Sequence, residues 1–270
     1  MKRSPFSPAM AGQRIPGLGI LLVSLPILVI AHHAAVLPHE YGHSVAAWLL
    51  GLKATPGSLR WGPPTLVNAL TLHGIGENVD YARSFAAGRG AAVALVAATG
   101  PLFVNGGAYL SARAVLPQAL PRLPWLGGLF LYWFLFMNLA NVFDYVPIRT
   151  FAQGDIGHFC QGLDIPSWVV CAVLTPLVLA ALLDLYRTVL PSLYRMLDLP
   201  LFARFATHIL TTSLMFGYFG LAGLHTSDTN SAHLSLLSLA CLPVVLVIGW
   251  PRRTWSRAKT DAATSSLRAV

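Results

Sequence analysis

Long apolar stretches alternate with short polar segments along almost the whole chain. A helix needs about 20 apolar residues to cross the hydrocarbon core of a bilayer. Six stretches meet that requirement, at roughly residues 18–51, 86–115, 125–147, 167–190, 201–224 and 232–250. The pattern therefore predicts an all-α polytopic membrane protein with about six transmembrane helices. The first stretch is long and contains Pro38, so we expect a kinked or tilted helix rather than two half-spans.

The polar segment between the first two apolar stretches carries the clearest turn signals. Residues 55–57, 62–64 and 74–76 combine Gly and Pro in patterns typical of turns. Between them, residues 65–72 (TLVNALTL) form a short β-prone run. We therefore expect a small β-hairpin or edge strand between the first two helices.

The composition supports a membrane protein over a soluble one. The chain has 270 residues, of which 55% are hydrophobic and 10% are charged, whereas soluble domains have about 25% charged residues. The net charge of +8 is explained by Lys and Arg in loops that face the negative side of a membrane. The three cysteines, Cys160, Cys171 and Cys241, have the spacing of neither a disulfide framework nor a metal site.

One motif in the first apolar stretch predicts chemistry. Residues 39–43 read His-Glu-Tyr-Gly-His, and Glu40 is the one formally charged residue between Gly17 and Gly51. On a helix, His39 and His43 share a face, so their imidazoles can bind one Zn²⁺. Glu40 is close enough on the same helix to serve a water molecule as general base. A charge at this depth costs about 2.5–3.5 kcal/mol and is a functional hypothesis by default.

A catalytic zinc usually has three protein ligands, so the motif lacks one. Successive spans run in opposite directions, which places the end of the third span at the same face as the end of the first. Asp144 lies at the end of that third span and Asp155 follows it closely, while Asp184 lies toward the opposite face. We favour Asp155 as the third ligand and keep Asp144 as the alternative. His158, three residues beyond Asp155, is read as a loop histidine.

With these residues the chain resembles the site-2 protease family of intramembrane zinc metalloproteases, over roughly residues 20–165. In that family the HExxH helix is followed by a β-rich re-entrant segment and by a helix with Gly-Pro and a nearby Asn. A third helix then ends in a motif whose Asp completes the zinc site. The resemblance implies His39, His43 and Asp155 as zinc ligands and Glu40 as catalytic base. Gly100-Pro101 and Asn105 match the second motif, and we expect Asn105 to assist as a hydrogen-bond donor to the oxyanion.

The hydrophobic pattern and the resemblance divide the chain into four parts. These are an N-terminal tail (1–17), a catalytic three-helix membrane core (18–165) with an inserted loop (52–85), three additional transmembrane helices (166–250) and a basic flexible C-terminal tail (251–270). The expected activity is hydrolysis of peptide bonds of membrane proteins within or near the bilayer. The expected partners are a transmembrane protein substrate and lipid, with no nucleic acid and no soluble substrate-binding domain. The expected location is a cell membrane, taken to be a bacterial inner membrane.

Two other functions remain open at this stage. His32-His33, on the same helix as the motif, suggests a membrane di-iron hydroxylase or desaturase. However, the remaining histidines are scattered singly, without a second histidine box. The other alternative is a non-catalytic metal-binding membrane scaffold.

The orientation in the membrane is also open. With six spans, both termini share a side, and most of the 18 Lys and Arg fall on it. The positive-inside rule then places both termini in the cytoplasm and opens the metal site to the outer face. The family resemblance instead implies a site nearer the cytoplasm. A break at Pro38 would change the count of spans and reconcile the two.

Overall fold

The computed structural model describes residues 17–251 and consists of helices joined by loops and turns. Six of its helices are long and apolar enough to cross a membrane: Gly19–Leu49, Gly90–Ala119, Trp125–Ile148, Ser167–Met196, Leu201–His225 and Thr229–Ile248. The prediction of an all-helical chain with six such helices is confirmed. The two predicted terminal tails fall almost wholly outside the described residues.

The spans are built from the following segments. The first span is formed by α1 (Gly17–Leu49), and the third by α6 (Trp125–Phe143) with η2 (Asp144–Ile148). The fifth is formed by α10 (Leu201–Gly217) with η4 (Phe219–His225), and the sixth by α11 (Thr229–Ile248). The second joins α4 (Gly90–Ala98), the π-helical η1 (Thr99–Gly106) and α5 (Gly107–Ala119), and the fourth joins α8 (Ser167–Asp184), η3 (Leu185–Val189) and α9 (Leu190–Met196). Three short helices lie between spans: α2 (Leu66–Thr71), α3 (Tyr81–Ala86) and α7 (Asp155–Leu163).

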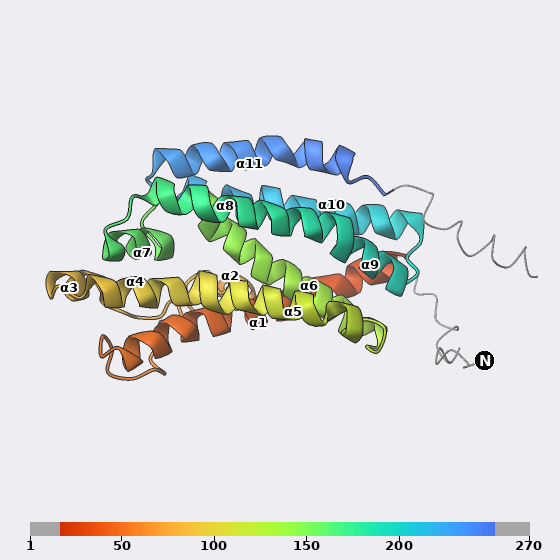
Figure 1. The fold of residues 1–270 in the computed structure, drawn as a ribbon. Helices are drawn as coiled ribbons and strands as arrows, with labels where there is room; N and C mark the ends of the chain where they lie inside the picture. Colours follow the sequence, from red (N-terminus) through yellow and green to blue (C-terminus); the bar gives the residue numbers. More distant parts are fainter. Residues whose placement is uncertain (1–16, 252–270) are drawn as a thin grey trace, which may run out of the picture.

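Helix α1 is continuous from Gly17 to Leu49 and includes both Pro26 and Pro38. At 1.5 Å per residue its length is about 50 Å, which exceeds the roughly 30 Å of a bilayer core. The first apolar stretch is therefore one long helix and not two half-spans. The helix begins at the end of the bundle where α11 finishes (Figure 1).

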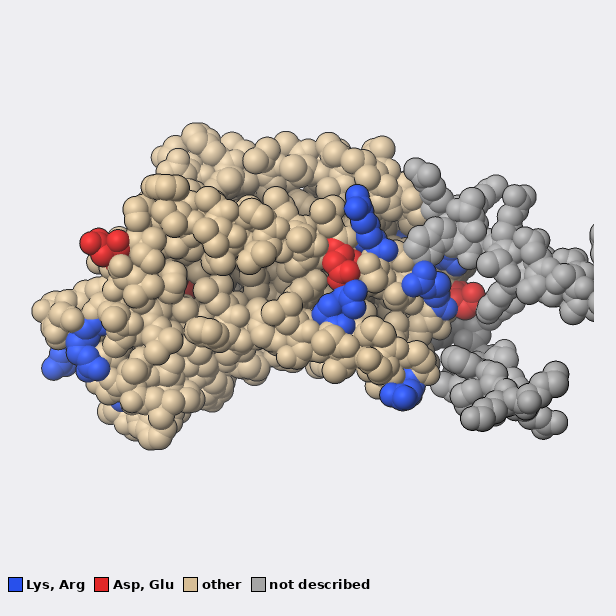
Figure 2. Space-filling model, viewed as in Figure 1, with Lys and Arg blue, Asp and Glu red and all other residues tan. Residues whose placement is uncertain are grey.

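Helix α6 lies at the centre of the bundle and passes between the other spans (Figure 1). Its large aromatic side chains Tyr132, Trp133 and Phe136 are at most 1% exposed. A helix that is apolar on all sides is expected in such a buried position. On the face drawn in Figure 2, the charged side chains gather toward the two ends of the helices and leave an almost uncharged band between them.

The predicted β-hairpin is wrong. Within the described residues no strand forms, and the loop contains a single isolated antiparallel bridge between Arg60 and Gly76. Residues 66–71 instead form α2, whose first turn is capped by the Thr65 hydroxyl accepting a hydrogen bond from the Asn68 backbone N–H. This local cap favours a helix over the weak β-propensity of the run.

The segment after α1 folds back along that helix. The Nε2 atoms of His32 and His33 lie 2.7 Å and 2.9 Å from the carbonyl oxygens of Thr71 and Ala69, at the end of α2. His32 lies about 25 Å back along α1 from Leu49, at 1.5 Å per residue. The loop therefore re-enters the zone of the spans instead of remaining outside it.

Helix α2 presents apolar side chains to the outside at this depth. Leu66, Val67 and Leu70 are 76%, 66% and 45% exposed, and the nearby Trp61 is 52% exposed. Such side chains are suited to contact with lipid, while the backbone between them is held by the protein. Both imidazoles of the His32-His33 pair face carbonyl oxygens of this segment, where they fasten it to α1.

Candidate metal centre

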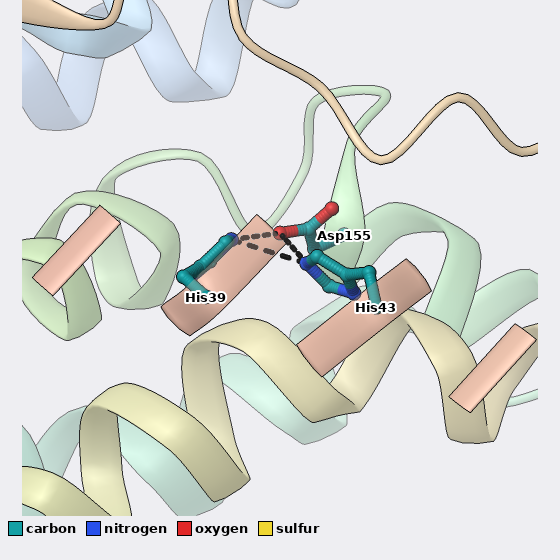
Figure 3. A group of neighbouring side chains, drawn as sticks. All are labelled: His39, His43 and Asp155. Atoms are coloured by element: carbon teal, nitrogen blue, oxygen red, sulfur yellow. Dashed lines mark hydrogen bonds and ion pairs between the residues drawn. The ribbon is translucent and has the colours of Figure 1, made fainter. Parts of the chain in front are cut away.

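Three side chains from two helices converge on one point beside α1. The Nε2 atoms of His39 and His43 are 3.1 Å apart, and Asp155 Oδ2 lies 3.2 Å from each (Figure 3). Both histidines are at most 2% exposed. These residues form a group that could hold a metal ion. The structure thus brings together the two histidines of the motif and the aspartate favoured from the sequence.

Hydrogen bonds at the far side of each ring fix the tautomer of both histidines. His43 Nδ1 lies 2.7 Å from the carbonyl oxygen of Val96 in α4. His39 Nδ1 lies 2.5 Å from the side-chain oxygen of Asn105 in η1. Since a carbonyl oxygen only accepts, each Nδ1 carries the proton and each Nε2 keeps its lone pair. This is the form and orientation in which histidine binds a metal.

Asn105 has a different role from the one expected. Its side-chain amide donates to Asn138 Oδ1 at 3.0 Å and to the Ala35 carbonyl at 3.1 Å, and the residue is 0% exposed. Both N–H groups are therefore used, and none remains for an oxyanion. Asn105 orients His39, and Asn138 orients Asn105. In the sequence, the one indication that Asn138 has such a role is its amide side chain within an apolar span.

Gly100 is required by the position of the two rings. A Cβ atom built on Gly100 would lie 2.2 Å from His43 Nε2 and 2.6 Å from His39 Nε2. No side chain fits there, so the donor atoms open onto a cradle lined by backbone. The next residue, Pro101, lacks an N–H and would clash in a regular α-helix, which agrees with the wider π-helical turn at this point.

Asp155 reaches the histidines because α7 lies very close to α4. A Cβ atom on Gly162 of α7 would be 2.3 Å from the carbonyl oxygen of Gly90 at the start of α4. The Oδ2 atom of Asp155 lies 3.2 Å from both Nε2 atoms, so a metal ion held between these three atoms would keep the carboxyl group as an anion.

Glu40 lies beside this group on α1. It is 9% exposed, and its Oε2 atom is buried without a hydrogen-bond partner. The carboxylate interacts electrostatically with both histidines and with Asp155. A buried carboxylate oxygen with no partner is costly, so this atom is available for a water molecule or a substrate.

Asp144, the alternative ligand, is bound elsewhere. Arg149 donates to Asp144 through Nε at 2.7 Å and through Nη2 at 2.5 Å. The guanidinium also lies 4.3 Å from the centre of the Tyr145 ring, and that ring stacks on His39 at 5.2 Å. This pair therefore supports one face of the His39 ring. Neither Arg149 nor Tyr145 could be assigned a role from sequence spacing.

The other residues weighed from the sequence do not join the group. Asp184 pairs with Arg113 of α5, with 3.0 Å between Oδ1 and Nη2. His158 belongs to α7 rather than to a loop, and its ring lies against Tyr81 of α3 at 4.5 Å. Within residues 17–251, no second cluster of three or more His, Cys, Asp or Glu side chains has metal-site geometry.

Comparison with known proteins adds no assignment. No protein-family model, no curated protein and no solved structure matches this chain.

The cradle at Gly100 gives the first prediction. Gly100→Ala should abolish metal binding, because its methyl group would occupy the space in front of both Nε2 atoms. The test is the zinc content of purified full-length protein, measured by mass spectrometry after exposure to Zn²⁺. Gly107→Ala is the control, since a Cβ on Gly107 meets no atom within 4 Å. Equal zinc contents in the two variants would contradict this account of the site.

Proposed function

We propose that this protein is an intramembrane zinc metalloprotease that hydrolyses peptide bonds of membrane protein substrates. The observation that carries the proposal is the juxtaposition of a buried His-His-Asp group with a buried carboxylate oxygen that has no partner. Metal ligands alone would also suit a scaffold. Glu40 adds a base in the place where hydrolysis needs one.

The donor set and its spacing support zinc. Two imidazole nitrogens and one carboxylate oxygen are ligands that zinc accepts, and three protein ligands leave one tetrahedral position open, as in catalytic sites. Ligand atoms of a tetrahedral zinc, each about 2.0–2.1 Å from the ion, lie about 3.3 Å apart. The three donor atoms here are 3.1, 3.2 and 3.2 Å apart.

The reaction needs a Lewis acid and a base. Bound zinc would supply the first by polarising the scissile carbonyl and by acidifying water. Glu40 accepts one proton of the attacking water while the water oxygen bonds to the carbonyl carbon. Glu40 then passes that proton to the amide nitrogen as the C–N bond breaks. The products are one amine and one carboxylic acid, and Glu40 returns to its starting state.

The position of the site favours a substrate within the membrane. His43 and His39 lie about 9 and 15 Å from the end of α1 at Leu49, at 1.5 Å per residue. A transmembrane segment that is locally unwound could present its peptide bond at this depth. The edge strand expected at residues 65–72 is absent, so we do not assign substrate pairing to that segment.

The resemblance to the site-2 protease family is retained as part of the proposal. Its sequence motifs supply the groups that contact the two histidines here: Gly100, Asn105 and Asp155. The di-iron alternative loses support, because His32 and His33 face backbone carbonyls of the re-entrant segment.

Removing the base should separate catalysis from metal binding. We expect Glu40→Gln to lower kcat by about 10²–10⁴-fold, which is the usual contribution of a general base. The zinc content should stay unchanged. The assay is cleavage of a membrane peptide whose transmembrane helix carries a Gly-Pro pair that destabilises it. Wild-type turnover in Glu40→Gln would end the proposal.

The matched control replaces a carboxylate that does not belong to the His-His-Asp group. Asp228→Asn changes the residue that caps α11, where its carboxylate accepts from the Ser231 N–H at 2.7 Å. Asparagine caps helices about as well as aspartate. This variant should therefore cleave the peptide at the wild-type rate.

Because α1 is one continuous helix, the number of spans stays at six. We therefore propose that the positive-inside rule gives the orientation of the protein in the membrane. The two termini are then cytoplasmic, and the loop after α1 faces outward. In a variant without native cysteines, Gly57→Cys should react with a membrane-impermeant thiol reagent in intact cells. A Cβ on Gly57 meets no atom within 4 Å, so the substitution is harmless to the fold.

The paired position is Pro121, in the exposed turn between α5 and α6. Pro121→Cys should react with the same reagent only after the cells are opened. The reverse pattern of labelling would show that the metal site opens toward the cytoplasm, as the family resemblance implies.

A further inference from the structure

Buried polar atoms without partners gather around the metal centre. Three of them, Glu40 Oε2, Tyr81 OH and His158 Nδ1, belong to this region. Buried polar atoms in native proteins are nearly always hydrogen-bonded. Glu40 has a role in the proposed reaction, but the other two atoms have none so far.

Tyr81 and His158 are placed beside Asp155. His158 and Asp155 are one turn apart on α7 and therefore lie on the same face of that helix. The Tyr81 ring lies 4.5 Å from the His158 ring, with 35° between their planes, and Phe85 flanks the same imidazole at 6.1 Å. Helix α3 thus holds the phenol against the face of α7 that supplies the metal ligand.

The phenol is surrounded by acidic groups of the site. Burial raises the pKa of Tyr81, and the carboxylates of Glu77, Asp155 and Glu40 raise it further. The hydroxyl therefore keeps its proton and acts as a hydrogen-bond donor. The Glu77 carboxylate interacts with this hydroxyl as a hydrogen-bond acceptor, but no described residue forms a hydrogen bond of normal length and angle with it.

Hydrolysis of a peptide bond is accelerated by such a donor. When water adds to the carbonyl carbon, the π electrons of the carbonyl move onto its oxygen, and that oxygen becomes negative. A donor already in place stabilises this charge. Asn105 cannot serve, because both of its N–H groups are bonded, and Arg149 is held by Asp144.

We infer that Tyr81 is a catalytic residue whose hydroxyl donates a hydrogen bond to the oxygen of the scissile carbonyl, and that His158 positions the Tyr81 ring. This inference rests on the proposed protease function. No proton is transferred from Tyr81 in this step. When the C–N bond breaks, the electron pair returns to form the new carbonyl, and the hydrogen bond to Tyr81 weakens again.

The first test is Tyr81→Phe in the full-length zinc-loaded protein, with the Gly-Pro membrane peptide as substrate. Loss of one oxyanion donor lowers kcat by about 10²–10³-fold, and we expect that fall with KM and zinc content unchanged. A peptide phosphonamidate, which imitates the tetrahedral oxyanion, should lose affinity by a similar factor in calorimetry. Affinity for the uncleaved peptide, measured in the Glu40→Gln background, should stay the same.

The control is Tyr194→Phe, which removes a phenol hydroxyl that donates to the Arg204 carbonyl at 3.1 Å, away from the metal centre. It should retain wild-type kcat and phosphonamidate affinity. For the positioning residue, His158→Ala should lower kcat, and His158→Phe should restore most of it because an aromatic ring again supports Tyr81.

The outcomes separate this inference from the proposed function. If wild type cleaves the peptide and Tyr81→Phe does so at the same kcat, Tyr81 is not the donor, while the protease proposal stands. Loss of zinc in Tyr81→Phe would also overturn the inference, since it would show a structural role. If wild type cleaves no better than Glu40→Gln, both proposals fall together.

Discussion

The structure depends on placing two histidines and an aspartate at one point inside a membrane-length helix bundle. Within lipid, polar groups must find their partners in the protein itself. The remote nitrogens of both imidazoles do so, through Val96 and Asn105, and the remaining nitrogens turn toward Asp155. Glycine makes this arrangement possible: Gly42 lets α1 approach Val104 of η1, and Gly100 leaves room in front of the rings.

The rest of the chain supports that point. Helix α6 supplies Asn138 to orient Asn105 and leads into η2, where Tyr145 stacks on His39. The segment after α1 folds back along it and leads to α3, which packs on α7 through Tyr81.

The sequence was sufficient for elements whose signal is local. The length of each apolar stretch predicts the spans, and the four-residue spacing of His39 and His43 predicts one shared face. Helix direction alone leaves two aspartates as candidates for the third ligand. In the structure, Asp144 pairs with Arg149, and Asp155 lies beside the histidines. The β-hairpin prediction failed because Thr65 caps a helix in a run whose strand propensity was weak.

Contacts between distant segments could not be foreseen, and Tyr81 and the bonds of Asn105 are of this kind. The most direct test of the central claim is X-ray absorption at the zinc edge on the purified full-length protein. We predict one zinc ion per chain with two imidazole ligands, oxygen in the remaining positions and no sulfur, and the loss of one oxygen ligand in Asp155→Asn. A sulfur ligand, a third imidazole, or an unchanged spectrum in Asp155→Asn would contradict that claim.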